Sequence, residues 1–186
     1  MIIQLCGLSG AGKTTIARNV QRKAAADGTP IEIIDGDIYR ESLCRDLGFS
    51  REDRCENIRR LGFVASRLSN YGIISIISAI NPYESIRQEL AISYPHVKTV
   101  FIDCTVEKLI ARDTKGLYKR ALLPEGHPDK LNNLTGINDP FETPVQPDLH
   151  LHTDNQSIAA CTNLFLQFIN RSLALQQAQY ASVASN

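Results

Sequence analysis

Short, almost continuous apolar runs recur along the chain and are separated by longer mixed stretches. These runs lie at residues 2–6, 31–35, 72–80 and 99–104, with a weaker one at 149–153. Strands that are apolar on both sides are typical of a parallel sheet covered by helices on both faces. The pattern therefore predicts five strands in a mainly parallel sheet.

Three of the intervening stretches place apolar residues at helical spacing. They cover residues 13–26, 51–69 and 156–182. The second begins after Ser50 and carries Asp53 three positions later, which resembles a capping box with Asp in place of Glu. Alternation of strands and helices predicts a doubly wound α/β fold, with helices on both faces of the sheet and ligands at the carboxyl ends of its strands.

One region interrupts this alternation. Residues 115–147 are rich in proline and glycine and carry several basic residues near their start. A connection of this length without regular structure is more often a lid or binding loop than a linker. We expect a mobile lid at about residues 113–147.

Composition narrows the class of protein. Twenty basic residues balance twenty acidic ones, so we expect neither a nucleic-acid partner nor a membrane surface. No apolar run is long enough to span a bilayer. The five cysteines show no metal-type spacing, and no secretory signal precedes them, so we expect reduced, mostly buried thiols in a cytoplasmic protein.

The segment GLSGAGKT, residues 7–14, satisfies the phosphate-loop pattern G-x-x-x-x-G-K-[ST] between a predicted strand and a predicted helix. Glycines allow backbone N–H groups to face phosphate oxygens, and the helix N-terminus adds positive potential. Lys13 can reach the β- and γ-phosphates of ATP, and the Thr14 hydroxyl can bind Mg²⁺. The expected ATP-binding residues of this loop are Gly7, Leu8, Ser9, Gly10, Ala11, Gly12, Lys13, Thr14 and Thr15.

The segment IIDGDIYR, residues 33–40, places Asp35 and Asp37 at the end of the second predicted strand. An Asp-Gly pair is a common turn former. Beside a phosphate loop, however, these carboxylates can bind Mg²⁺ through water or accept the proton of an acceptor hydroxyl. The chain lacks the N-K-x-D element of a GTPase, so a small-molecule kinase is favoured, and which Asp takes the proton stays open.

The chain resembles the adenylylsulfate kinase (APS kinase) family from residue 3 to about residue 154. The matching blocks are GLSGAGKTT, DGDIYR, LGFSREDRCENIRR, SAINPYESIR, RDTKGLYKRA and LTGINDPFETPVQPDL. From the length of the chain we expect a single domain over residues 1–180, which the resemblance makes a P-loop kinase domain, and from its composition a disordered tail at 181–186. The resemblance also implies transfer of the ATP γ-phosphate, with Mg²⁺, to the 3′-hydroxyl of adenosine 5′-phosphosulfate in sulfate assimilation, by a homodimer.

The resemblance further implies roles for individual residues. The acceptor pocket would be lined by Asp37, Arg40, Phe49, Arg54, Asn57, Ile80 and Asn81. Phe49 can stack on adenine, while Arg40 and Arg54 can meet the phosphosulfate. The alternatives are core packing for Phe49 and a solvated helix face for the arginines.

The lid would contribute further residues. Lys115 would lie near the transferred phosphate and Arg112 over the ATP adenine, while Asn133 and Leu134 would make backbone contacts to the acceptor. Both cations could stabilise the transition state once the lid excludes water. The predicted catalytic residues are Lys13, Asp35, Asp37 and Lys115, with Thr14 and Asp35 on the metal side.

Two departures from the family pattern leave alternatives open. Asn81 stands where many members carry a serine, which excludes a phosphoserine at that position. The segment LLPEGHPDKLNN, residues 122–133, is longer than usual and lacks the lysine that normally precedes the LTGIN segment. A kinase of the same fold with another nucleotide or sugar acceptor, or a nucleotide-binding regulator without activity, therefore stays possible.

His150 and His152 alternate along the fifth predicted strand. A pair at this spacing could suggest a metal site. Because no third ligand accompanies them in the sequence, we expect surface strand residues.

Overall fold

The computed structural model describes the backbone of residues 1–184 and the side chains of residues 1–179. Its five strands are all parallel and lie in the order β2-β3-β1-β4-β5. Their bounds are β1 (Ile2–Cys6), β2 (Ile31–Asp35), β3 (Ile74–Ser78), β4 (Val97–Asp103) and β5 (Leu149–His152). The predicted α/β architecture is confirmed, with β5 at one edge of the sheet and β2 at the other.

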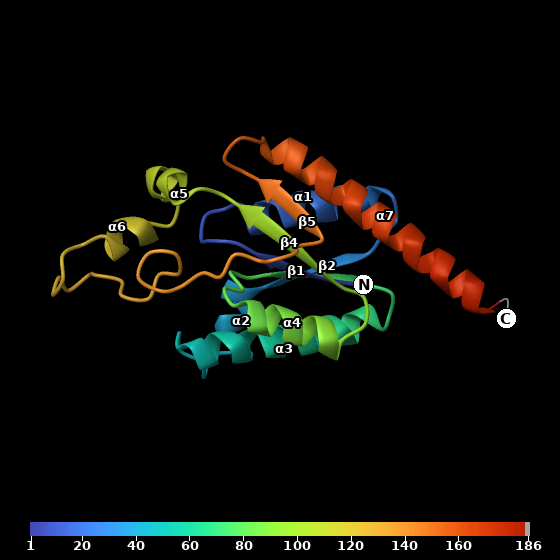
Figure 1. Ribbon diagram of the computed structural model, residues 1–186, viewed down its shortest axis with the longest axis horizontal. Coiled ribbons are helices and arrows are strands. Elements are labelled where there is room, and N and C mark those ends of the chain that lie inside the picture. Colours follow the sequence, from blue (N-terminus) through green and yellow to red (C-terminus); the bar gives the residue numbers. More distant parts are fainter. Residues whose placement is uncertain (185–186) are drawn as a thin grey trace.

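Helices cover both faces of the sheet (Figure 1). On one face lie α1 (Lys13–Ala26) and α7 (Ile158–Ala184), which pack on each other, and on the other lie α2 (Gly36–Arg40), α3 (Arg51–Ser69) and α4 (Glu84–Ser93). The three predicted helices appear as α1, α3 and α7. The Ser50 hydroxyl accepts a hydrogen bond from the Asp53 N–H (3.1 Å), which caps α3 at the predicted start. Part of the tail predicted at residues 181–186 lies outside the described residues.

The central strand β1 shows how the sequence builds two cores. Ile3 and Leu5 pack with α1 and α7, whereas Ile2 packs with α3 and α4, because successive side chains of a strand point to opposite faces. The side chains of both cores are almost fully buried. The five cysteines are free and buried, as predicted. Among the described helices, none is long and apolar enough to cross a membrane.

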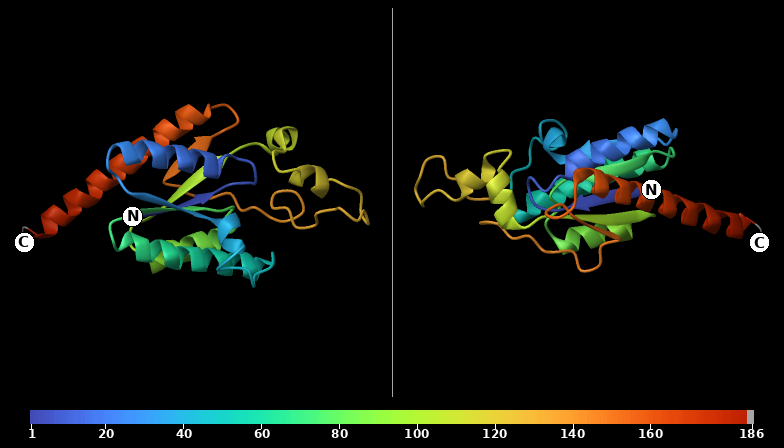
Figure 2. Two further views of the ribbon diagram at one scale, coloured as in Figure 1. Left: turned by 180° about the vertical axis from the view of Figure 1, so that it is seen from behind. Right: turned by 90° about the horizontal axis from the view of Figure 1, so that it is seen from above.

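The segment between β4 and β5 projects from one end of the sheet, as both views of Figure 2 show. It begins with α5 (Val106–Arg112) and continues through α6 (Leu117–Ala121) into a long irregular return. Helices α2, α4, α5 and α6 were not predicted, since each has ten residues or fewer and lacks a long apolar period. The carboxyl ends of the strands face this projecting segment, which places any ligand site there.

Candidate active site

The phosphate loop joins β1 to α1 in a conformation that its glycines make possible. Gly7 has φ +144°, and a Cβ there would lie 2.2 Å from the Ile102 carbonyl oxygen, so no larger residue fits. Lys13 donates hydrogen bonds to the carbonyl oxygens of Gly7 and Leu8, both at 2.8 Å. Burial, and next the charge of Lys115, lower the pKa of Lys13 to about 8. The two hydrogen bonds hold the ammonium group over the loop. An anion bound there would raise the pKa of Lys13 back toward its usual value.

A cavity of about 370 Å³ lies in front of this loop. Besides the loop residues from Ser9 to Thr15, it is lined by Asp35, Asp37, Ser78, Arg112 and Lys115. Arg112, at the end of α5, also donates to the Thr153 carbonyl (2.9 Å). The predicted ATP-binding residues thus line one cavity, with two exceptions. Gly7 and Leu8 do not line it, but their carbonyl oxygens accept the hydrogen bonds from Lys13.

Three oxygen-bearing side chains meet at the floor of this cavity. The Thr14 hydroxyl donates to the Asp35 carboxylate at 3.0 Å and lies 2.9 Å from the Ser78 hydroxyl. Hydroxyl and carboxylate oxygens are the ligands that Mg²⁺ prefers, so the donor set fits the expected metal. Ser78 was not predicted, although its position at the end of β3 places it at the same sheet edge as Asp35.

Asp37 and Lys115 bridge the body and the projecting segment. The Asp35 carboxylate caps α2 by accepting a hydrogen bond from the Asp37 N–H (3.0 Å). The Asp37 carboxylate then forms an ion pair with Lys115 at 2.6 Å, with both side chains more than half exposed. Asp37 is therefore the more accessible carboxylate of the pair.

A second, smaller cavity of about 70 Å³ lies beside the first. Its lining includes every residue predicted for the acceptor pocket, namely Asp37, Arg40, Phe49, Arg54, Asn57, Ile80 and Asn81. The Phe49 ring is half exposed and lies 4.6 Å from the Arg40 guanidinium carbon and 5.4 Å from that of Arg54. The sequence-distant blocks of the acceptor prediction thus converge in space.

Two buried amides leave polar atoms unused in this cavity. The Oδ1 atoms of Asn57 and Asn81 have no hydrogen-bond partner in the described part of the chain. An unpaired buried acceptor costs about 1–3 kcal/mol, so both amides carry an unfavourable term beside this cavity. Asn81 also adopts φ +49°, which is unusual for a residue with a side chain.

Arg54 is the point where the projecting segment closes over the acceptor cavity. Its guanidinium donates to the carbonyl of Asn133 (2.7 Å) and pairs with the Asp139 carboxylate (2.7 Å). Asp139 was not predicted as a site residue. Asn133 and Leu134 do not line the cavity; Leu134 is buried, and its N–H donates to the Asn138 side chain (2.8 Å).

The base of the projecting segment is fixed to the phosphate loop by a residue that the sequence did not single out. Tyr118, on α6, donates from its hydroxyl to the Ser9 carbonyl (2.8 Å). Burial raises the pKa of Tyr118 to about 12, so this donor stays protonated over the physiological range. The projecting segment and the phosphate loop are therefore in direct contact.

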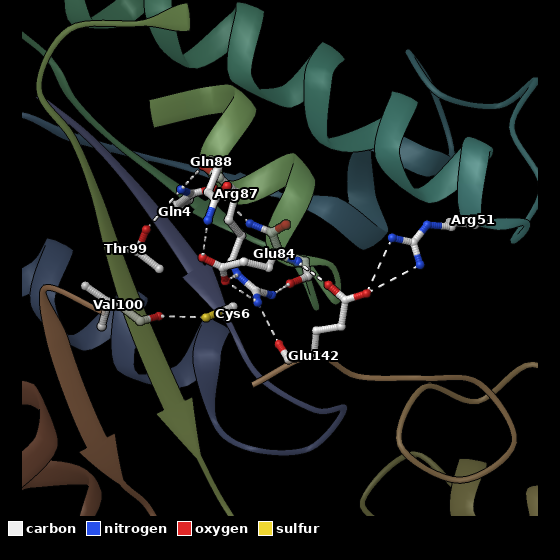
Figure 3. Close-up of polar contacts among 10 residues, drawn as sticks. Gln4, Cys6, Arg51, Glu84, Arg87, Gln88, Thr99, Val100 and Glu142 are labelled. Atoms are coloured by element: carbon white, nitrogen blue, oxygen red, sulfur yellow. Dashed lines mark hydrogen bonds and ion pairs between the residues drawn. The ribbon is translucent and has the colours of Figure 1, made fainter. Parts of the chain in front are cut away.

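Figure 3 shows the network that fixes the other end of the lid. Arg87, on α4, donates to the Asn81 carbonyl (2.7 Å), to the Glu142 carbonyl (2.6 Å) and to the Glu84 carboxylate. The Glu142 carboxylate accepts the Glu84 N–H (2.7 Å). On its other side, Asn81 donates to the Gln4 side chain (2.9 Å). Asn81 and the end of the lid thus share one buried anchor.

The prediction for the histidine pair is partly wrong. His150 and His152 lie on the surface of β5 as expected, but a third metal-type ligand, Asp103, lies beside them. This group could not be inferred from the sequence, because Asp103 is distant along the chain and becomes the neighbour of His152 only through the β4–β5 register.

The chain has a parallel sheet with a phosphate loop after β1, acidic side chains at the end of β2 and a basic segment after β4. This arrangement is that of a P-loop phosphotransferase. The family model described as adenylylsulphate kinase matches residues 1–152. The chain therefore belongs to the adenylylsulfate kinase family, whose members are ATP-dependent phosphotransferases.

Individual relatives agree with this assignment. The adenylyl-sulfate kinase of Chloroflexus aurantiacus is 45% identical over 171 residues, which cover 92% of this chain and 89% of the relative. That of a Synechococcus species is 43% identical, with 91% and 94% coverage. The structure of a Mycobacterium tuberculosis APS kinase in complex with AMPPNP and APS superposes with a TM-score of 0.84 and 34% identity, covering 91% of this chain and 96% of that one. The predicted family, fold and enzyme class are confirmed.

Proposed function

We propose that this protein transfers the γ-phosphate of ATP to the 3′-hydroxyl of adenosine 5′-phosphosulfate, and that the residues of the two adjoining cavities carry this reaction. The observation that supports the proposal most is the convergence of the acceptor blocks around one cavity next to the phosphate loop. Arg40, Phe49 and Arg54 combine an aromatic face with two guanidinium groups. This combination suits a ligand that carries both an adenine and a dianionic tail.

On the donor side, the phosphate loop and Lys13 would hold the β- and γ-phosphates. Mg²⁺ would be held by Thr14 and Asp35, with Ser78 as a further oxygen ligand, and would supply charge neutralisation between the phosphates. Arg112 lines the same cavity and would lie over the adenine. Little covalent chemistry is required of the protein, because phosphoryl transfer depends mainly on positioning and electrostatics.

On the acceptor side, Asp37 is the better candidate to orient the hydroxyl and receive its proton. Asp35 is committed to Thr14 and to the N-terminus of α2, whereas the Asp37 carboxylate is exposed between the two cavities. A hydroxyl placed beside Asp37 would also lie beside Lys115, which is paired with that carboxylate. Lys115 would then shift toward the transferred phosphoryl group as charge develops on it.

The cavity in front of Phe49 is too small for a nucleotide, since ligand pockets usually measure about 300–1,000 Å³. We propose that the lid opens to admit the acceptor, by exchange of the Arg54 contacts to Asn133 and Asp139 for contacts to the phosphosulfate. A mobile lid at 113–147 within one domain, a homodimer and a cytoplasmic location are parts of the same proposal.

The deciding experiment incubates the purified protein with ATP, Mg²⁺ and adenosine 5′-phosphosulfate and detects the 3′-phosphorylated product directly. Product formation supports the proposal. Absence of product while ATP still binds would contradict it and point to another acceptor for this fold.

A matched pair of variants tests the acceptor pocket itself. Phe49→Ala should raise the KM for adenylylsulfate by about tenfold or more, since base–aromatic stacking contributes roughly 1–3 kcal/mol, and leave the KM for ATP nearly unchanged. Phe63→Ala is the control, because Phe63 is also an exposed phenylalanine but lies on α3, outside the acceptor cavity. It should change neither the KM for adenylylsulfate nor the KM for ATP. Equal losses for both nucleotides in Phe49→Ala would refute the stacking role.

A further inference from the structure

The edge of the sheet remote from Asp35 carries a cluster that the phosphotransferase reaction does not use. Asp103 ends β4, and its register partner on β5 is His152, while His150 pairs with Phe101. Leu149 and Leu151 alternate with the histidines and pack toward α1 and α7. Asp103, His150 and His152 therefore share the opposite face of the sheet. They lie at the edge that β5 forms (Figure 1).

We propose that Asp103, His150 and His152 form a binding site for a first-row transition metal ion such as Zn²⁺, separate from the magnesium site at the phosphate loop. One ligand atom from each residue lies within 4.8 Å of the other two. The Asp103 Oδ2 atom is 3.0 Å from His150 Nε2 and 3.5 Å from His152 Nδ1. In a tetrahedral site with metal–ligand distances of about 2.0–2.1 Å, neighbouring ligand atoms lie about 3.3–3.4 Å apart. The two distances bracket that value.

The chemistry of the ligands selects the ion. Two imidazoles and one carboxylate suit Zn²⁺, Co²⁺, Ni²⁺ or Cu²⁺, whereas Mg²⁺ and Ca²⁺ prefer oxygen ligands throughout. With neutral imidazoles the cluster carries the single negative charge of Asp103, which favours a cation. Each side chain is about 36–44% exposed, so the ion can enter from solvent and keep water at its remaining position.

The ligands are also held in place before any ion binds. The His150 ring stacks on Phe101 at 4.7 Å between centroids, and its centroid lies 4.0 Å from that of the His152 ring. Phe101 in turn stacks on Phe141 at 6.0 Å. The Asp103 carbonyl accepts hydrogen bonds from the N–H and the hydroxyl of Thr153, which fixes the backbone beside two ligands. Preorganisation of this kind lowers the cost of binding a metal.

The proposed metal site is connected to the phosphate loop through Thr153. Thr153 follows His152 directly, and its hydroxyl donates to the Ala11 carbonyl in the phosphate loop (2.9 Å). Arg112 donates to the Thr153 carbonyl. The metal would therefore stiffen the segment that supports the phosphate loop from behind without contacting the reacting groups.

The test uses the full chain without a histidine tag, freed of metal by a chelator and kept in excess Mg²⁺. Titration with Zn²⁺ by calorimetry should show one ion per chain, and Co²⁺ should give the visible absorption of a tetrahedral site. His150→Gln/His152→Gln should weaken Zn²⁺ binding by at least about tenfold, whereas His127→Gln, the same change on the lid, should not. Equal binding in wild type and double variant, or no binding in wild type, would overturn the proposal.

A measurement on the wild type keeps the proposal testable if the double variant does not fold. Paramagnetic Co²⁺ should broaden the ring proton signals of Phe101 and Phe141 first and leave those of Tyr71, at the end of α3, unaffected. Broadening centred elsewhere would overturn the assignment. Phosphotransfer supported by Mg²⁺ should continue in the double variant if it folds, since neither histidine lines the reaction cavities.

Discussion

Arg87 offers the sharpest test of how the buried network supports the fold and the site. Its side chain is only 2% exposed, yet it carries a positive charge, which proteins bury only when it is fully paired. The guanidinium satisfies the buried backbone carbonyl of Asn81, the partly buried carbonyl of Glu142 and a carboxylate of Glu84 that keeps 26% exposure. We therefore expect Arg87→Met, which retains much of the apolar stem, to destabilise the protein strongly.

The magnitude follows from the groups left behind. The buried Asn81 carbonyl loses its charged donor at about 1–3 kcal/mol, and the partly buried Glu142 carbonyl loses its donor at the low end of that range. Glu84 loses its ion-pair partner but stays partly solvated and still accepts from Gln88 (3.1 Å), so its contribution is smaller. The sum of about 2–5 kcal/mol overlaps the usual cost of about 3–5 kcal/mol for breaking a buried ion pair from one side.

Urea unfolding measures this change directly. A loss of about 4 kcal/mol moves the midpoint by about 2 M if m is about 2 kcal/mol/M. Arg59→Met is the matched control, because Arg59 on α3 pairs with Glu89 and Glu56 but is 46% exposed, so its loss should cost less than about 1 kcal/mol. Equal shifts for the two variants would refute the reasoning. Since Arg87 also holds the Asn81 carbonyl beside the acceptor cavity, the KM for adenylylsulfate should rise more than that for ATP.

Two further variants address the charges at the phosphate loop. The folded pKa of Lys13, lowered by burial to about 8, lies below the usual value of about 10.4 in an unfolded chain. Between about pH 8 and about pH 10.4 the unfolded chain binds more protons than the folded protein, so the free energy of unfolding should rise with pH. Lys13→Met should make this rise smaller. Urea midpoints measured at several pH values between these limits would show the difference. Lys115→Ala should lower kcat by about 10²–10³ if Lys115 stabilises the transferred phosphoryl group. With the exposed Asp37 ion pair lost, stability should change by less than about 1 kcal/mol, and a fall in kcat of less than about tenfold would refute that role.

The regular elements that create the sheet could be predicted because their signals are local. The apolar run of β1 and the stripe of Ile16, Ala17, Val20 and Ala24 on α1 are each complete within one segment. The short helices escaped prediction, since α2 depends on a cap supplied by Asp35 and on packing against α3, not on its own period. Such elements form because tertiary contacts stabilise them.

The candidate site divides in the same way. Lys13, Thr14 and Asp35 belong to compact motifs, so their roles could be inferred from spacing alone. A place in the site could not be inferred for Ser78, Arg87, Asp139 or Glu142. Each of them contacts the site through a partner that is distant along the chain. Asp103 is the clearest case, because it joins the two histidines only through strand register.

The longer lid was the main reason to expect a different acceptor, and its contacts argue against that concern. Residues 122–130 are tied to themselves and to α6: Arg120 donates to the Asp129 carbonyl (3.2 Å), and Lys130 pairs with Glu125 (2.8 Å). This loop extends away from the sheet at the far end of the projecting segment (Figures 1 and 2). Asn133 and Asp139 contact Arg54, which lines the acceptor cavity, but neither of them lines the cavity itself.

The extra length should therefore leave acceptor choice unchanged. Replacement of residues 125–129 by two glycines removes the Lys130 ion pair, which costs little at a surface, and shortens a loop whose closure entropy depends only weakly on length. We expect kcat/KM for adenylylsulfate to stay within about threefold of wild type, equivalent to less than about 0.7 kcal/mol. A loss beyond about tenfold for adenylylsulfate, with the KM for ATP unchanged, would instead show that the loop folds over the acceptor during turnover. In the expected case, specificity resides in the pocket lined by Phe49, Arg54, Asn57 and Asn81.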